Sequence, residues 1–152
     1  MKILMIAPTP FFSDRGCHVR VLNSCLRLKR EKNKITLITY PLGRNIQNIN
    51  IKRTLNLLGY KKTSPGFSFY KPFLDFFLLL KCFWEMKKVQ YDLVYAHLHE
   101  GALIGIILGK LFKKRVIFDA QGSLVGELIA QGTIKNLGTP NPNAVSLSQC
   151  RY

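Results

Sequence analysis

The chain has 152 residues, of which 47% are hydrophobic and 20% charged, and its 23 lysines and arginines outnumber 8 acidic residues to give a formal net charge of +15. The length suits a single domain, and this apolar content excludes an intrinsically disordered chain. The positive charge favours polyanionic partners (nucleic acid, anionic lipid or phosphorylated small molecules) without choosing among them.

The four cysteines, at positions 17, 25, 82 and 150, contain no C-x-x-C pair, and no secretory signal precedes them. We therefore expect reduced thiols in a cytoplasmic protein. Cys17 and His18 are adjacent, but no second pair of ligands with zinc-site spacing follows, so no metal site is predicted.

The first part of the chain predicts a strand–helix–strand unit. Residues 2–7 (KILMIA) are continuously apolar, as in a strand buried on both faces, and a Pro-Thr-Pro sequence ends them. A helix is expected over 16–32, followed by a β-branched strand over 35–40. The expected apolar face of this helix contains Val19, Leu22, Cys25 and Leu26.

The rest of the chain continues the alternation. Residues 41–72 are basic, polar and rich in glycine and proline, and predict loops around a short strand near 49–51. Beyond them we expect helices over 73–88, 101–112 and 124–131 and strands over 92–97 and 115–119. This order predicts an α/β fold: a Rossmann-like parallel sheet with helices on both faces. The predicted domain covers 1–135, and 136–152 are predicted to form an irregular tail.

Two segments raise the question of a membrane. Residues 73–84 are strongly apolar, but they are well short of the ~20 residues that span a bilayer. Gly101, Gly105 and Gly109 form a ridge of small residues, which in a membrane would suggest helix dimerisation. We expect instead that these glycines let the helix lie close against the sheet.

Candidate binding residues lie where strands lead into helices, since ligands of open α/β sheets bind there. In the first such loop, Gly16 stands at the start of a helix, where a phosphate could approach its amide, and Arg15 precedes it. Asp14 could equally be an ordinary N-cap. The loop is neither G-x-G-x-x-G nor a P-loop, which disfavours a different Rossmann-like enzyme such as a dehydrogenase or an epimerase.

The second loop, AHLHEG, brings two imidazoles and a carboxylate to one strand end. His97 and His99 are two apart and would face the same side of a strand, and Glu100 could act as a general base or bind a hydroxyl. Alternatively, His97 is a core histidine and Glu100 a helix-start carboxylate.

The third loop, DAQGS, ends the last predicted strand. Asp119 and Gln121 offer directional polar contacts that suit a ligand rich in hydroxyls, and Gly122 and Ser123 form the turn. An Asx-type turn is the competing interpretation.

Taken in order, KILMIAPTPFFSDRGCHVRVLN, YDLVYAHLHEGALIG and KKRVIFDAQGSLVGEL resemble the N-terminal domain of family 4 glycosyltransferases. The resemblance implies a GT-B architecture, in which an N-terminal Rossmann-like domain binds the acceptor and a C-terminal one holds the nucleotide-sugar donor. It also implies retention of anomeric configuration, with no metal to hold the diphosphate. Gly16 would take the place of the family's first-loop glycine near the donor phosphates. A strand-end histidine of the family appears here as Gln121, which leaves His97 and His99 as the imidazole candidates.

The resemblance therefore predicts the acceptor-binding part of a retaining glycosyltransferase. It predicts no cofactor bound by this chain, a nucleotide-sugar donor for the complete enzyme, and a sugar or lipid-linked acceptor. A donor domain is absent from the 152 residues, so we expect the chain alone to be inactive and to be either a fragment or one subunit of a split enzyme.

The alternative is a basic, non-catalytic module that binds an anionic membrane surface or nucleic acid, although no specific nucleic-acid motif is present. A peripheral location on the inner membrane face is expected in the first case, with aromatic residues inserting beside lysines. The residues of that predicted patch are Lys61, Lys62, Phe67, Phe69, Tyr70, Lys71 and Phe73. The alternative is that its aromatic residues belong to the core.

Overall fold

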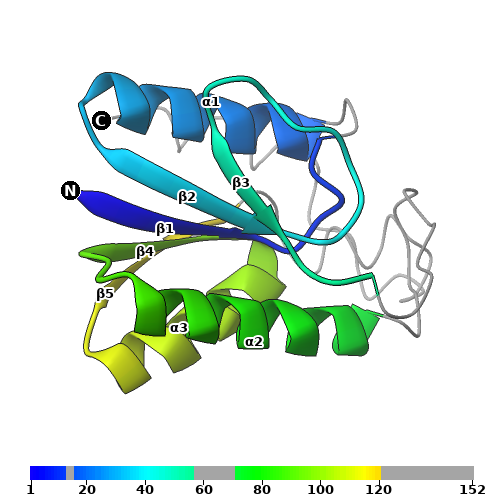
Figure 1. Cartoon of the computed structure of the whole chain (residues 1–152), viewed down its shortest axis with the longest axis vertical. Coiled ribbons are helices and arrows are strands. Elements are labelled where there is room, and N and C mark those ends of the chain that lie inside the picture. The colour runs from blue at the N-terminus through cyan, green and yellow to red at the C-terminus, as the bar shows by residue number, and fades with distance from the viewer. Residues whose placement is uncertain (13–15, 57–70, 121–152) are drawn as a thin grey trace, which may run out of the picture. The chain divides into compact units, whose positions relative to one another are not determined.

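The computed structural model describes residues 1–12, 16–56 and 71–120, which contain a five-stranded parallel sheet and three helices (Figure 1). The strands are β1 (Lys2–Ala7), β2 (Lys34–Thr39), β3 (Asn50–Arg53), β4 (Leu93–His97) and β5 (Arg115–Asp119). The helices are α1 (Gly16–Arg30), α2 (Lys71–Lys88) and α3 (Leu98–Phe112).

The strands lie in the order β3-β2-β1-β4-β5, with β1 at the centre. All four pairings are parallel, and the β1–β2 pairing runs in register from Lys2 opposite Lys34 to Ala7 opposite Thr39. Helix α1 covers one face of the sheet, and α2 and α3 cover the other (Figure 1). The predicted Rossmann-like α/β fold is confirmed.

The central position of β1 in the sheet explains why its sequence is continuously apolar. Because β1 is flanked by strands on both edges and by helices on both faces, residues from Leu4 to Ala7 are fully buried. Leu4 and Ile6 belong to the core under α2 and α3, whereas Ile3 and Met5 belong to the core under α1. Alternate residues of one strand thus join two separate cores.

The glycine ridge of α3 faces the sheet, as predicted. A Cβ atom on Gly105 would lie 3.1 Å from Ala96 Cβ, and one on Gly101 would lie 3.1 Å from Pro8 Cδ. The contact is closest at Gly109, where a Cβ would lie 2.3 Å from Val116 Cγ2. The ridge is therefore a packing feature that brings α3 onto β4 and β5.

Several predicted boundaries were wrong. Helix α3 begins at Leu98 rather than Gly101, because Leu98 adopts a left-handed φ of 61° and turns the chain from strand into helix at once. Helix α2 begins at Lys71 rather than Phe73. In α1 the expected apolar face is also shifted: His18, Val21 and Cys25 are buried, whereas Val19 is exposed.

Other predictions lie outside the described residues. These are the helix over 124–131, the tail over 136–152, the domain boundary at 135, the residues Asp14, Arg15, Gln121, Gly122 and Ser123, and all of the predicted membrane patch except Lys71 and Phe73. Within the ranges that are described, none of the helices has both the length and the apolar character to cross a bilayer.

We predict that Gly109→Ala destabilises the fold by about 1–3 kcal/mol, because its Cβ must displace the β-branched side chain of Val116 in a packed core. Gly16→Ala is the matched control, since a Cβ there meets no atom within 4 Å. Urea unfolding followed by circular dichroism measures both changes. Equal stability of the two variants would contradict the close packing of α3 on the sheet.

Candidate functional site

The strand order reverses direction between β1 and β4. The chain passes outward from β1 through β2 to β3 and then returns to place β4 on the other side of β1. In parallel α/β sheets, ligands bind outside the carboxyl ends of the strands at such a reversal, where the flanking loops separate. The loop after β1, the start of α1 and the turn from β4 into α3 all meet at this edge.

A three-residue cluster lies at this edge, which we call the Asp119 cluster: Arg20, His97 and Asp119. The guanidinium of Arg20 donates twice to Asp119, from Nη2 to Oδ1 at 2.5 Å and from Nε to Oδ2 at 3.2 Å. His97 Nδ1 lies 3.2 Å from Asp119 Oδ2. Asp119 and His97 are buried, whereas the Arg20 side chain is 54% exposed.

Burial determines the protonation state of His97. It lowers the pKa of the imidazole to about 4, more than the neighbouring Asp119 carboxylate raises it, and Arg20 lowers it further. His97 is therefore neutral at pH 7. In a neutral imidazole, an Nδ1–H that donates to Asp119 makes the other ring nitrogen an acceptor.

The loop after β1 is anchored on the same edge. Thr9 Oγ1 and His18 Nε2 are 2.6 Å apart in a buried hydrogen bond, and the rings of Phe11 and Phe12 lie 5.9 and 6.0 Å from the His18 ring. His18 of α1 thus ties the loop to the helix. At the start of that helix, Gly16 is exposed, and its missing side chain leaves open space.

Arg53 and Gly43 fix the other side of this loop. The Arg53 guanidinium, at the end of β3, donates to the carbonyls of Phe11 at 2.5 Å and Leu42 at 2.8 Å. Gly43 has a φ of 115°, and a Cβ there would lie 2.0 Å from the Phe11 carbonyl oxygen. Only glycine fits this close approach of two loops.

A second polar group, which we call the Glu100 cluster, lies where α2 and α3 begin: Tyr40, Lys71, Asp75 and Glu100. Lys71 pairs with Glu100, and the Tyr40 hydroxyl donates to Asp75 Oδ1 at 2.5 Å. Burial raises the pKa of Asp75, against the lowering by the Tyr40 hydrogen bond. Burial also raises the pKa of Glu100, but the hydrogen bond from Lys71, the helix-start backbone and nearby cations outweigh it, so that pKa is lowered overall.

The predicted site residues are thus divided between the two faces of the sheet. His97 and Asp119 meet, on the face covered by α1. His99 and Glu100 belong to α3 on the other face, with the His99 ring 5.8 Å from that of Phe118. The expectation that His97 and His99 face the same side was wrong, because the turn at Leu98 ends the strand between them.

Arg20, Tyr40 and Asp75 were not predicted from the sequence as members of these clusters, and Lys71 was predicted only for the membrane patch. Arg20 is an exposed helical arginine whose partner lies 99 positions away, so no local pattern distinguished it. Asp75 interrupts an apolar helix, and this interruption was the only available signal. The carboxyl edge of the sheet therefore offers hydrogen-bond donors and acceptors, together with the half-exposed guanidinium of Arg20.

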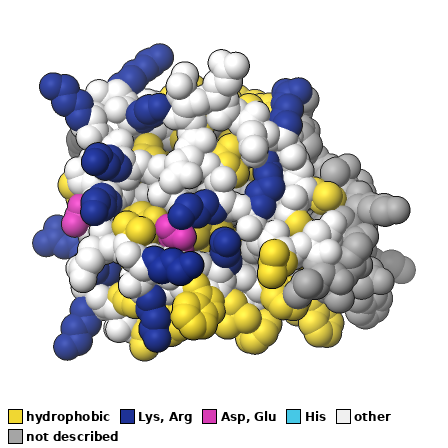
Figure 2. Space-filling view, in the orientation of Figure 1, with side chains coloured by type: hydrophobic (Ala, Val, Ile, Leu, Met, Phe, Trp, Pro, Cys, Tyr) yellow, Lys and Arg dark blue, Asp and Glu magenta, His cyan; other side chains and the backbone are white. Residues whose placement is uncertain are grey.

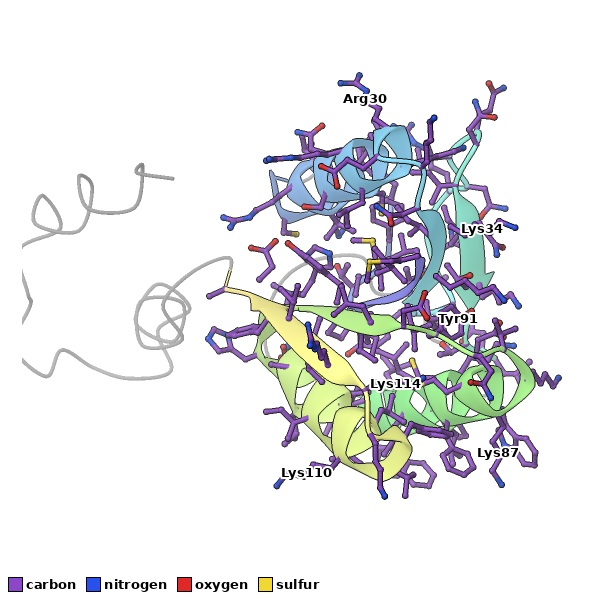
Figure 3. The ribbon with its side chains drawn as sticks, turned by 90° about the vertical axis from the view of Figure 1, so that its left-hand side faces the viewer. Arg30, Lys34, Lys87, Tyr91, Lys110 and Lys114 are labelled. Atoms are coloured by element: carbon purple, nitrogen blue, oxygen red, sulfur yellow. The ribbon has the colours of Figure 1, made fainter. Side chains whose placement is uncertain are left out.

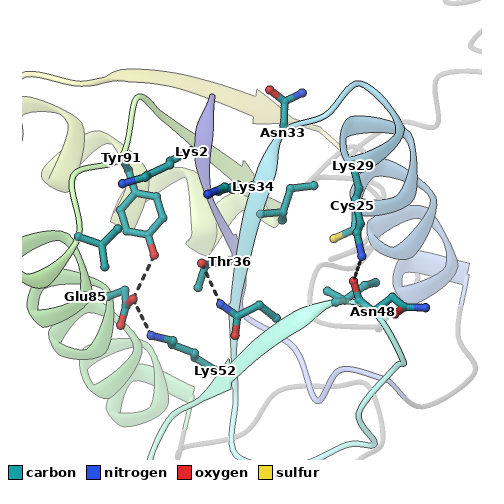
Figure 4. Close-up of a pocket in the computed structure, with 14 residues that line it drawn as sticks. Lys2, Cys25, Lys29, Asn33, Lys34, Thr36, Asn48, Lys52, Glu85 and Tyr91 are labelled. Atoms are coloured by element: carbon teal, nitrogen blue, oxygen red, sulfur yellow. Dashed lines mark hydrogen bonds and ion pairs between the residues drawn. The ribbon is translucent and has the colours of Figure 1, made fainter.

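A pocket of about 470 Å³ lies away from this edge, at the amino ends of the strands (Figure 4). Lys2 and Lys34 begin β1 and β2 there, and Glu85 accepts hydrogen bonds from Lys52 at 2.7 Å and Tyr91 at 3.1 Å. The hydrogen-bonded Glu85 ties α2 to the edge of the sheet. Because parallel sheets bind ligands at the opposite edge, we assign this pocket a structural role.

No protein-family model matches the chain, and no curated protein matches it. Among solved structures, the chain is similar to the glycosyltransferase SsfS6 of Streptomyces sp. SF2575, a GT-B enzyme crystallised with thymidine diphosphate. The TM-score is 0.53 at 16% sequence identity, and the match covers 86% of this chain and 44% of SsfS6. The likeness shows the fold, a Rossmann-like α/β sheet, and the chain spans less than half of the length of SsfS6.

The depressed pKa of His97 predicts a pH-dependent stability. The unfolded chain takes up a proton near the ordinary histidine pKa of about 6.5, whereas the folded chain does so only near 4, so stability is complete above 6.5 and is lost as the pH falls toward 4. Between pH 7 and 5 this amounts to about 2 kcal/mol.

Urea unfolding at the two pH values measures this loss. His97→Gln should remove most of the difference, whereas His99→Gln, the control on the same turn, should keep it. A pH dependence that is unchanged in His97→Gln would contradict the assignment of a buried neutral imidazole.

Proposed function

We propose that the chain is the acceptor-binding part of a retaining glycosyltransferase, which moves a sugar from a nucleotide-sugar donor to an acceptor. The observation that supports this most is the Asp119 cluster at the reversal of strand order, in a fold shared with a GT-B glycosyltransferase. The membership in family 4 that the sequence motifs suggest is part of the proposal.

In this proposal the Asp119 carboxylate accepts a hydrogen bond from an acceptor hydroxyl. The fork from Arg20 and the contact with His97 hold the carboxylate in one orientation, which a sugar hydroxyl needs for directional binding. His97 is fully buried and acts through Asp119 as a positioning residue. Gln121, Gly122 and Ser123, which follow Asp119 in the sequence, are assigned to acceptor binding as part of the proposal.

Gly16 and Arg15 are assigned to the donor phosphates. The exposed start of α1 presents backbone amides and the positive end of the helix dipole, and Gly16 adds no side chain that would block an anion. Arg20, one turn further along α1, adds a half-exposed guanidinium to the same side. SsfS6 was crystallised with thymidine diphosphate, which agrees with a nucleotide-sugar donor for the proposed reaction.

His99 and Glu100 remain catalytic candidates from the other face. Glu100 has a lowered pKa and is ionised at pH 7, while Asp75 beside it has a raised one. Two carboxyl groups with pKa values displaced in opposite directions are the usual arrangement for an acid and a base. The pairing of Glu100 with Lys71 must open before Glu100 can accept a proton from a substrate.

We predict that acceptor binding depends on Asp119. Asp119→Asn should weaken binding of a responsive mono- or disaccharide roughly 10- to 100-fold, because a hydrogen bond to a charged group is replaced by a weaker one. Asp92→Asn is the matched control, since Asp92 is an exposed carboxylate at the amino edge of the sheet, beside Lys2. Saturation-transfer difference NMR over a saccharide panel measures both, and unfolding midpoints verify that the variants are folded. Equal weakening by the two variants would contradict the proposed acceptor site.

We also predict that the chain alone transfers no sugar. The transition state requires donor and acceptor held together, and the described residues contain one Rossmann-like sheet, not the pair that faces across a GT-B cleft. A radiolabelled transfer assay with a panel of nucleotide sugars, with a two-domain glycosyltransferase as positive control, tests this. Turnover by the isolated chain would overturn the division into an acceptor part and a separate donor part.

A basic binding module remains the second candidate, and the specific observation that favours it is the distribution of charge. Residues 1–64 contain 13 basic and 2 acidic residues. Lys2, Lys32 and Lys34 line a second pocket beside the first one at the amino edge. Such a surface would bind nucleic-acid phosphates with an affinity that falls steeply with salt.

A further inference from the structure

The outer surfaces of α2 and α3 are unusually apolar. Eight large hydrophobic side chains are exposed on them, and we call this set the α2–α3 outer face: Phe73, Phe76, Leu80, Trp84, Leu103, Ile106, Ile107 and Leu111. Trp84 is 57% exposed and Leu103 is 63% exposed. Figure 2 shows hydrophobic side chains gathered in the lower part of the view, over α2.

These residues are not needed for the core. The inward sides of the same helices already supply it, through residues such as Leu74, Leu78, Ile104 and Leu108. Phe73, Phe76, Leu80 and Trp84 follow at intervals of three and four, which places them along the opposite side of α2. A helix that is apolar on both its inner and outer sides is unusual at a water-exposed surface and indicates a second apolar environment.

Lysines border this face. Lys87 and Lys110 both lie on the outer side of the two helices (Figure 3), Lys88 ends α2, and Lys113 follows α3. The Lys87 ammonium lies over the rings of Phe83, 4.8 Å from the centroid, and Trp84, at 5.8 Å. Each of these lysines can extend its charge beyond the apolar surface while its methylene stem lies on it.

The carboxylates of α2 and α3 do not lie on this outer face. Helices α2 and α3, which are described throughout, contain three of them: Glu85 is buried against Lys52 and Tyr91, Asp75 is bonded to Tyr40, and Glu100 is paired with Lys71. None of the three is exposed. The outer face therefore combines exposed apolar groups with positive charge alone.

We propose that the α2–α3 outer face binds the surface of an anionic lipid bilayer. The apolar side chains would enter the boundary between headgroups and acyl chains, and Lys87, Lys88, Lys110 and Lys113 would contact lipid phosphates. Charge complementarity favours this occupant over a second copy of the chain, because two copies meeting through this face would bring their lysines together. The surface differs from the predicted patch over 61–73, with which it shares Phe73.

Binding to a bilayer through the α2–α3 outer face would also orient the candidate site. Helices α2 and α3 lie side by side and begin at the carboxyl edge of the sheet, where the Glu100 cluster lies (Figure 1). A chain lying on a bilayer through these helices holds that edge close to the headgroups, so that an acceptor carried by a lipid can reach it. This consequence rests on the proposed function, whereas the docking surface does not.

The single tryptophan makes the proposal measurable, since Trp84 is the only one in the chain and lies on the outer face. With vesicles of phosphatidylcholine and phosphatidylglycerol, its emission should shift to shorter wavelength and be quenched by lipids brominated on the acyl chains. Vesicles of phosphatidylcholine alone should bind the chain at least tenfold more weakly, because they lack the anionic headgroups.

Two pairs of variants test the surface. Lys87→Gln with Lys110→Gln should weaken binding to anionic vesicles about 30-fold. The control is Arg30→Gln with Lys34→Gln, which removes the same charge from positions away from this face (Figure 3) and should change binding less than threefold. Likewise, Phe76→Ser with Ile107→Ser should abolish the quenching, whereas Val19→Ser with Leu55→Ser, exposed apolar residues elsewhere, should preserve it.

The following results would overturn the proposal. Equal weakening by the two charge pairs would mean non-specific attraction by net charge, and tighter binding to duplex DNA that depends on Lys87 and Lys110 would make nucleic acid the partner. A concentration-dependent emission shift without lipid would make a second copy the occupant. None of these readouts involves saccharides or sugar transfer. Failure of the proposed function would therefore not affect the result on the bilayer, and failure to bind the bilayer would not contradict the proposed function.

Discussion

The carboxylate of Asp119 joins three parts of the fold that are distant in sequence. It ends β5, it receives both guanidinium bonds of Arg20 from α1, and it contacts His97 at the end of β4. A buried carboxylate is stable only when such partners compensate for lost hydration. The arrangement therefore determines where α1 lies relative to the edge strand, and it leaves the first turn of α1 facing the same edge as the strand ends.

This constraint explains why the polar residues of the edge form two groups rather than one. His97 must stay inside to meet Asp119, and its burial keeps it neutral. Leu98 then reverses the local backbone, so Glu100 emerges on the other face and pairs with Lys71. A ligand at this edge would lie between a cluster whose carboxylate is buried and held by two partners and a cluster whose carboxylate is itself partly exposed. The second is the one that can rearrange on binding at low cost.

The features of the fold that depend on residues close in sequence could be predicted. The apolar run of β1, the strand–helix alternation and the inward glycines of α3 all follow from local pattern, and all three are confirmed. Asp119 could be placed at a strand end, but not its partner Arg20, because a side-chain pair across 99 positions has no local signal. His97 and His99 were wrongly expected on the same face, because Leu98 adopts a left-handed conformation that ends the strand between them. The sequence has no glycine at this position that would have indicated such a turn.

The hydrophobic pattern of α2 and α3 was also insufficient to predict which of their apolar side chains are exposed. Periodicity predicts an apolar helix over 73–88, but it does not separate side chains that fill the core from those that face outward. Only the packing shows that Leu74 and Leu78 complete the core while Phe76 and Trp84 remain outside it. Selection for solubility alone would replace such residues with polar ones at little cost to the core. Their presence beside lysines, with every carboxylate of the two helices turned inward or paired, fits a partner that is apolar and anionic together, and an anionic bilayer surface, the partner we propose, combines both properties.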